Sequence, residues 1–139
     1  MNSEVKCVIV ADEELPTGVL ANTSVILGMT LGKLIPEYVG EDVWDASNLV
    51  HMGITKIPIP ILKGTKEMIR NLRTKLYGDD FSDLLTVDFS DVAQGCMEYK
   101  DYIDNAKNLA EEDFNYLGIA IYGNKKKVNK LTGFLPLLR

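Results

Sequence analysis

An apolar strand near each end of the sequence constrains the fold of this chain more than any other feature. Residues 5–10 (VKCVIV) form the first strand, which leads through an acidic turn into a nearly uncharged stretch, residues 19–32. Residues 117–123 (LGIAIYG) form the second strand, and the basic segment 124–130 follows it. Strands that are apolar throughout are typical of central strands covered on both faces. We therefore expect strand 5–10 in the interior of a sheet, with a helix at 18–32 packed against it.

The middle of the sequence alternates strands and helices. Ile and Pro alternate over residues 57–62, which is typical of an edge strand because proline donates no hydrogen bond to a neighbouring strand. Residues 43–45 and 49–51 have the pattern of a short hairpin. We also expect a helix that Thr65 caps and Gly78 ends, a strand at 84–89, a helix at 99–110 and a strand at 116–122. This order predicts an α/β fold, a three-layer α/β/α sandwich with a mixed, mostly parallel sheet of four to five strands.

Composition limits the classes of function. With 139 residues, of which 46% are hydrophobic and 25% charged, the chain fits a single domain spanning residues 1–139. The net charge of −5 speaks against nucleic acid as a partner, because Lys and Arg supply most of that affinity. Cys7 and Cys96 have no metal-ligand spacing, and no uncharged apolar run is long enough to span a membrane. We expect a cytoplasmic protein without a secretory signal, membrane segment, metal ion or cofactor.

The loop after the first strand is one candidate ligand site. It lies between the end of a strand and the start of a helix, where open α/β sheets bind ligands and where free backbone N–H groups favour anions. Thr17 and Gly18 lie in this loop, and Asn22 lies one turn into the helix. The alternative is purely structural: Pro16 and Gly18 make the turn and Thr17 caps the helix.

The run Lys125, Lys126 and Lys127 is a second candidate site, because it follows the last strand. Its cations face the same rim as Thr17 if the first and last strands are parallel neighbours. The alternative is that the run is the solvated start of a helix. A small anionic or nucleotide-like ligand is expected in one pocket shared by Thr17, Gly18, Asn22, His51, Lys125, Lys126 and Lys127.

His51 is the only histidine, and it lies in the expected hairpin. A lone histidine is more often structural or exposed than catalytic, because imidazole needs a partner carboxylate or nucleophile to be tuned for proton transfer. The sequence has no GxSxG motif, and neither cysteine has a recognisable histidine partner. Hydrolysis on the plan of a catalytic triad therefore has no support.

Short motifs at both ends of the chain resemble the peptidyl-tRNA hydrolase type II superfamily. The first loop of those hydrolases reads Gly-Lys-Gly-Lys before a helix that contains Ala-Ala-Gln. In this sequence Gly18 and Ala21 agree with that pattern, whereas Thr17 and Val19 stand in place of the lysines. The closest match is at the other end, in Leu-Gly-Ile at 117–119 and Lys-Leu-Thr-Gly at 130–133.

Two further residues match the hydrolases singly. Asp88 matches the aspartate of their Asp-Ala-Gly-Arg-Thr segment, although the arginine is absent here, and Lys63 matches a lysine at the end of the second long strand. Residues 91–114 are an addition that the hydrolases do not need. Over nearly its whole length the chain is more closely similar to an uncharacterised bacterial family, domain of unknown function number two thousand. The resemblance implies the hydrolase fold with its lysine motif lost.

Two classes of function remain. The first is a protein that binds a small anionic ligand. The alternative is a hydrolase that cleaves an aminoacyl or peptidyl ester with Asp88, His51, Asn22 and Lys63 as its polar residues. The loss of both lysines favours binding. The oligomeric state stays open, with a homodimer among the options.

Overall fold

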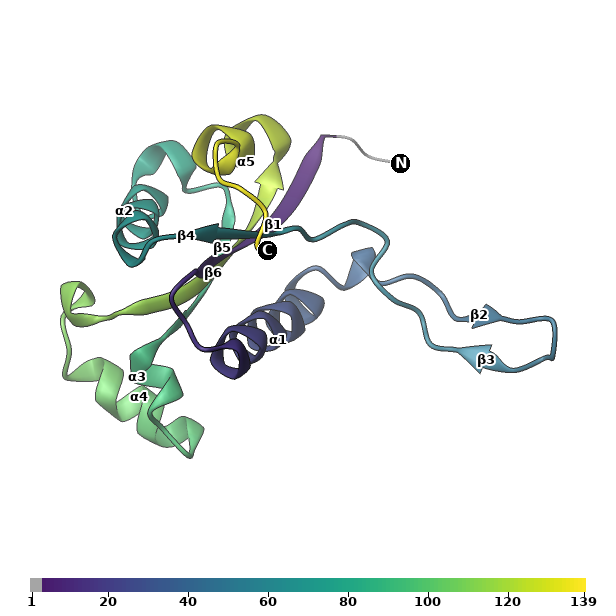
Figure 1. The fold of residues 1–139 in the computed structure, drawn as a ribbon, viewed down its shortest axis with the longest axis horizontal. Coiled ribbons are helices and arrows are strands. Elements are labelled where there is room, and N and C mark those ends of the chain that lie inside the picture. Colours follow the sequence, from purple (N-terminus) through teal and green to yellow (C-terminus); the bar gives the residue numbers. More distant parts are fainter. Residues whose placement is uncertain (1–3) are drawn as a thin grey trace.

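A mixed sheet of four strands forms the centre of the computed structural model, which describes residues 4–139. The strand order is β4-β1-β6-β5 (Figure 1). The expected interior position of the first strand is confirmed, because β1 lies between β4 and β6. The bounds are Val5–Asp12 for β1, Ile61–Gly64 for β4, Leu85–Ser90 for β5 and Tyr116–Asn124 for β6.

The expectation of a mostly parallel sheet is wrong. Of the three strand pairs in this sheet, only β1 with β4 is parallel, whereas β6 runs antiparallel to both β1 and β5. The reason is the connection between β5 and β6, residues 91–115. A parallel return needs a crossover along the face of the sheet. This connection instead stays at the end of the sheet where β5 finishes. The next strand, β6, therefore starts at that end and runs back antiparallel to β5.

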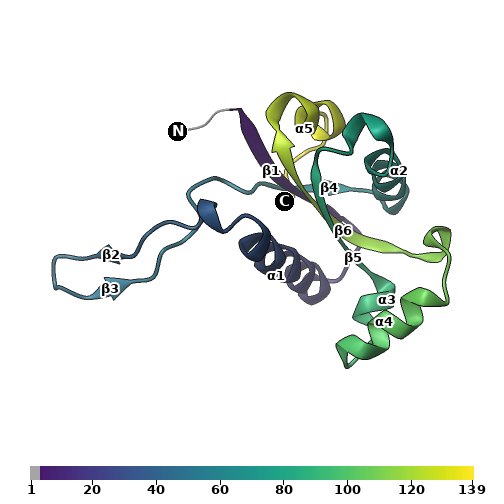
Figure 2. The ribbon, with the colours of Figure 1, turned by 180° about the vertical axis from the view of Figure 1, so that it is seen from behind.

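Helices cover both faces of the sheet, so the three-layer arrangement is as expected (Figures 1 and 2). Helix α1 lies on one face, α2 and α5 lie on the other, and the short helices α3 and α4 lie beside β5. Thr65 caps α2 as expected, because its hydroxyl accepts a hydrogen bond of 3.1 Å from the backbone N–H of Met68. The bounds are Thr17–Leu34 for α1, Lys66–Leu76 for α2, Asp91–Gln94 for α3, Tyr99–Lys107 for α4 and Lys125–Thr132 for α5.

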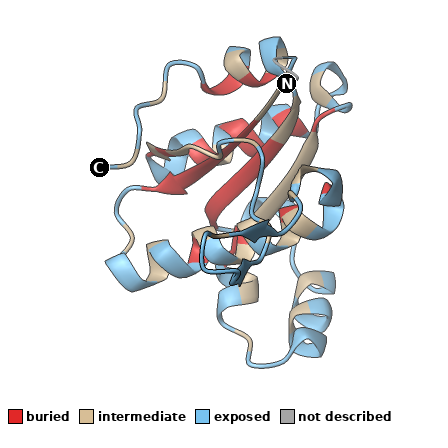
Figure 3. Cartoon of the chain, turned by 90° about the vertical axis from the view of Figure 1, so that its right-hand side faces the viewer, coloured by how far each residue is buried: buried red, intermediate tan, exposed pale blue. Residues whose placement is uncertain are grey.

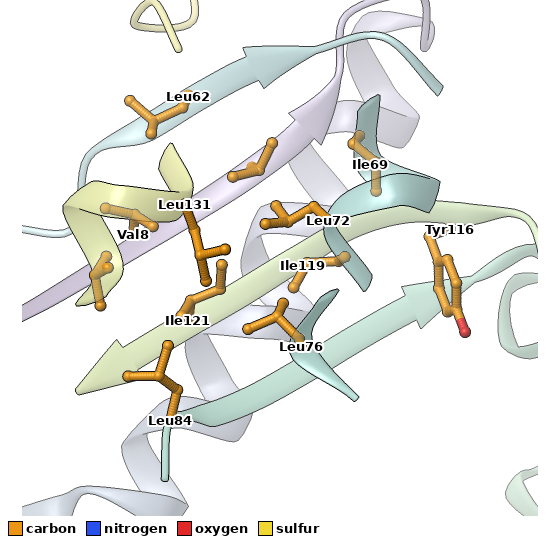
Figure 4. Close-up of a cluster of buried hydrophobic side chains, with 12 residues drawn as sticks. Val8, Leu62, Ile69, Leu72, Leu76, Leu84, Tyr116, Ile119, Ile121 and Leu131 are labelled. Atoms are coloured by element: carbon orange, nitrogen blue, oxygen red, sulfur yellow. The ribbon is translucent and has the colours of Figure 1, made fainter. Parts of the chain in front are cut away.

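Alternating side chains of β1 and β6 divide the core into two clusters. On one face Val8, Val10, Ile119 and Ile121 pack against α2 and α5 (Figure 4). On the other face Cys7, Ile9 and Ala120 pack against α1, and burial raises the pKa of the Cys7 thiol to about 11. Cys7 therefore acts as a small hydrophobic residue. Figure 3 shows the buried residues gathered in the central strands and in the helix surfaces that face them.

The expected hairpin also forms. Its strands are β2 (Val43–Trp44) and β3 (Val50–His51), which pair antiparallel and project from the body of the molecule (Figures 1 and 2). The expected edge strand is shorter than the sequence suggested. Only Ile61–Gly64 forms β4, although the carbonyl of Pro60 still accepts a hydrogen bond of 3.0 Å from Ile9.

Gly118 lets α1 pack directly on the backbone of β6, so replacing it with alanine should destabilise the fold. A Cβ at Gly118 would lie 2.7 Å from the Thr23 methyl group and 3.2 Å from a Leu27 methyl group. We expect Gly118→Ala to lower the free energy of unfolding by about 1–3 kcal/mol, the usual cost of overpacking, as measured by urea denaturation. Gly18→Ala is the control, because a Cβ added at Gly18 would meet no neighbouring group within 4 Å. Equal stability of the two variants would contradict this packing.

Candidate functional site

The first loop and the start of α1 lie at the end of the sheet where β1, β4 and β5 reach their C-termini. Thr17, Gly18 and Asn22 are all exposed there. The alternative reading of Thr17 as the helix cap is wrong, because the residue in the capping position is Pro16 and it makes no side-chain cap. The carboxylate of Asp12 accepts a hydrogen bond of 2.9 Å from the backbone N–H of Glu14, which shapes the turn.

The prediction of one shared pocket is wrong, because the opposite end of the sheet holds Lys125, Lys126 and Lys127. Strand β6 runs antiparallel to β1, and its last residue, Asn124, pairs with Val5 at the start of β1. The lysines begin α5, whose N-cap is Asn124. The structural alternative therefore describes this run better than the ligand site does. Lys127 donates to Asp83 at 2.8 Å.

The four residues expected for a hydrolase are not brought together either. His51 lies on the projecting hairpin, where its Nε2 is 2.8 Å from Asp45 and its hydrogen bond lowers the pKa of that carboxyl group. Lys63 lies on β4 and Asp88 on β5, which are opposite edges of the sheet. Three strand spacings separate these edges by roughly 14 Å.

A groove beside β5 has the features of a ligand site, and it was not among the sites expected from the sequence. One hollow of about 410 Å³ lies between α1, β5 and the α3–α4 segment, and a second of about 300 Å³ adjoins it at Asp88 and Tyr102. We call the two hollows together the β5 groove. The first is lined by Ile26, Thr30, Val87, Asp88, Phe89, Ala93, Cys96, Met97, Glu98, Tyr99 and Tyr102.

Asp88 is held in the β5 groove by an arginine from α2. Nε of Arg73 donates to Oδ2 of Asp88 at 3.0 Å, and Nη2 forms an ion pair with the same oxygen at 2.9 Å. The guanidinium group of Arg73 is itself placed over the ring of Tyr77, 3.8 Å from its centroid. Within residues 4–139, the other oxygen of Asp88, Oδ1, has no hydrogen-bond partner. Asp88 therefore offers the groove a fixed acceptor.

Tyr102 lies beside this acceptor and remains protonated at neutral pH. Partial burial raises the pKa of its phenol, and the charge of Asp88 raises it further. Tyr102 can thus donate or accept a hydrogen bond in the groove. Cys96 also lines the groove, where its thiol contacts the carbonyl of Val92 at 3.1 Å. With His51 on the hairpin, this cysteine has no histidine to activate it.

Two polar clusters fix the segment that forms the wall of the groove. At its ends, both carboxylate oxygens of Asp91 accept hydrogen bonds from Asn115, from the backbone N–H at 3.0 Å and from the side-chain amide at 2.9 Å. At the far side Glu111 accepts from the hydroxyl of Tyr116 and from Arg70, both at 2.5 Å. Hydrogen bonds to α2 and β6 therefore hold the wall of the groove in a fixed position.

Sequence reasoning missed the groove because its lining comes from separate elements. Two signals in the sequence pointed to it: a charged residue, Asp88, within a strand, and Tyr99 with Tyr102 one helical turn apart on α4. Across residues 4–139, no cluster of three or more His, Cys, Asp or Glu side chains is arranged to hold a metal ion.

Glu111 should titrate below its ordinary pKa of 4.5. The hydrogen bond from Tyr116 is the main cause of the lowering, and Arg70 adds to it. A lowered pKa stabilises the fold above pH 4.5, and this contribution is lost as the pH falls through the folded-state value. We expect carboxyl NMR to give a Glu111 midpoint below 4.5, and Tyr116→Phe to move it upward. Tyr99→Phe is the control, and an unchanged midpoint in Tyr116→Phe would contradict the assignment.

Comparison with known proteins agrees with the fold. One solved structure, that of a protein of unknown function, Atu0240, from Agrobacterium tumefaciens strain C58, superposes with a TM-score of 0.87 over 98% of each chain at 16% sequence identity. No curated protein matches the sequence. Within residues 4–139, no helix combines the length and the apolar character needed to cross a membrane. The family described as "Protein of unknown function (DUF2000)" matches residues 5–139, and the chain therefore belongs to that family.

Proposed function

We propose that this protein binds a small molecule in the β5 groove, and that the ligand has an apolar, aromatic body and an N–H donor such as an amine. The unpartnered Oδ1 of Asp88 carries the proposal. It is an acceptor, so it pairs with a donor, and Arg73 already fixes its position. Small-molecule sites typically combine apolar walls with a few fixed polar groups.

The walls of the groove suit an aromatic body. Val87 and Phe89 from β5 and Ile26 from α1 supply apolar surface, and Tyr99 and Tyr102 supply rings. A volume of about 410 Å³ lies within the usual range for small ligands. Aromatic rings also attract cations through their faces. An amine with an aromatic group would therefore use both kinds of lining.

The charges in the groove favour an amine over the anionic ligand expected from the sequence. Its ionisable carboxyl groups are Asp88, Glu98 and Glu111. Among residues 4–139, no Lys or Arg lines either hollow, and Arg73, which contacts Asp88, is already paired with it. An anion would face these carboxylates without a free cation in the same hollow. Anion binding by Thr17, Gly18 and Asn22 at the start of α1 remains a separate prediction.

Matched pairs of probes test the proposed ligand chemistry. We expect tryptamine and phenethylamine to bind, and indole-3-propionate and 3-phenylpropionate to bind at least tenfold more weakly, as measured by isothermal titration calorimetry. Ala93→Phe should fill the groove and weaken amine binding at least tenfold, since Ala93 lines it. Gln94→Phe adds the same ring to an exposed neighbour outside the lining and should bind like the wild type.

Several outcomes would contradict this proposal. Equal or tighter binding of the carboxylates would mean that the acceptor at Asp88 does not select the ligand. Amine binding that survives Ala93→Phe would place the amine outside the groove. Absence of binding by both amines would leave the groove without the proposed function.

We further propose that the chain is a distant member of the peptidyl-tRNA hydrolase type II-like superfamily that lacks the hydrolase activity. The resemblance at 117–119 and 130–133 supports the membership. The absence of lysines at Thr17 and Val19 supports the loss, because the acceptor end of tRNA is polyanionic and the net charge of the chain is −5.

Purified protein should therefore release no peptide from peptidyl-tRNA above the rate without protein. The measurement is release of a labelled peptide, with a peptidyl-tRNA hydrolase as the positive control. Efficient release that disappears in Lys63→Ala would overturn this prediction and favour the hydrolase alternative.

A further inference from the structure

The hairpin that contains β2 and β3 is an ordered arm with apolar side chains in solvent. We call residues 40–54 the arm. Trp44, Met52 and Ile54 are 66%, 70% and 79% exposed, and Val43 and Leu49 are about as exposed. An isolated two-stranded hairpin is marginally stable in water. An arm of this composition therefore gains stability when another surface covers it.

Hydrogen bonds fix the arm's shape and direction. At its tip, the Asp45 carboxylate accepts from the backbone N–H groups of Ser47 and Leu49. At its base, Gly40 donates to the carbonyl of Ile54 at 2.8 Å, and Gly53 lies so close to Gly40 that no side chain fits there. The arm projects away from the body (Figures 1 and 2), so it does not cover its own chain.

Helix α1 has a matching uncovered surface. Lys33 is its only charged residue over 18 positions. Its inner side packs on the sheet, yet Val25 and Met29 on its outer side are 65% and 82% exposed. A helix that is hydrophobic all round is usually buried all round, and residues 25–29 of α1 (VILGM) contain no polar side chain. The outer side of α1 therefore also has the character of a covered surface.

A concave apolar groove joins α1 to the base of the arm. It measures about 280 Å³, and Leu31, Ile35 and Ile57 supply part of its lining. Gly28 and Gly32 of α1 also line it, and nothing lies within 4 Å of a Cβ placed on either glycine. The groove is thus open above the helix, where a strand or an aromatic side chain can approach its backbone.

We propose that a second copy of this chain covers these surfaces, in a two-fold dimer in which each arm lies along α1 of the partner. The arm projects away from α1 of its own chain (Figures 1 and 2), so it cannot cover that helix. A two-fold axis places each arm on α1 and the open groove of the other copy, so both surfaces are covered at once. The arm runs out and back over residues 40–54, so each half of about seven residues extends at most roughly 23 Å, close to the roughly 27 Å of an 18-residue helix.

The available area also fits a dimer. Six large apolar side chains on the arm and two on α1 are exposed, namely Val43, Trp44, Leu49, Val50, Met52, Ile54, Val25 and Met29. At roughly 100 Å² for each side chain, one copy offers about 800 Å². That is the area that each partner buries in a standard stable interface.

Sedimentation of the full chain tests the dimer. We expect wild type at twice the monomer mass of 15.5 kDa. Gly28→Arg should be monomeric, because it fills the groove at a position where the single chain has room for a side chain. Asn71→Arg is the control, because Asn71 is an exposed residue of α2 on the opposite face of the sheet from α1, and this variant should stay dimeric. Trp44→Ser should also weaken the dimer at least tenfold.

Tryptophan fluorescence provides a second measurement, because Trp44 is the only tryptophan. Its emission should lie at short wavelength in the dimer and shift to long wavelength in Gly28→Arg or on dilution of the wild type. A wild type that sediments as a monomer at 100 µM would overturn the proposal and assign the apolar surface to a different partner. A dimer that persists in both Gly28→Arg and Trp44→Ser would overturn it as well, by placing the interface elsewhere.

Discussion

The direction of β6 determines the layout of the whole molecule. This strand is buried from Tyr116 to Ile121 and pairs along its length with β1 on one side and β5 on the other. Because β6 runs antiparallel to both neighbours, α5 starts at the end of the sheet opposite the first loop. The same direction requires residues 91–115 to stay at the edge where β5 ends, and this segment forms the wall of the β5 groove.

The hydrophobic pattern was enough to predict which segments form strands and helices, but it does not encode strand direction. The interior position of β1, the helix α1 and the hairpin all follow from local periodicity, and the structure has each of them. Strand direction depends on the path of the connection between β5 and β6. That path is fixed by Asp91 with Asn115 and by Glu111 with Tyr116 and Arg70. These pairs are distant in sequence, and no periodicity reports them.

The candidate site shows the same limit at the level of single residues. Asp88 was recognisable as a charged residue in a strand, but its role depends on Arg73, a residue of α2 that lies 15 positions away in the sequence. In the structure Arg73 is 9% exposed and paired with Asp88. Burying this pair costs desolvation, which good geometry and added hydrogen bonds offset. A partner so placed can be found only once α2 and β5 are packed together.

Charge and apolar surface are separated on helix α1 but mixed on the arm, and the difference bears on association. Helix α1 carries one charged residue, Lys33, so covering its outer side desolvates little charge. The arm exposes its apolar side chains beside Glu41, Asp42 and Asp45, of which Asp42 and Asp45 accept hydrogen bonds within the arm. The net charge of −5 makes two copies repel at long range. Apolar burial between the arm and α1 therefore has to exceed this repulsion, which salt screens.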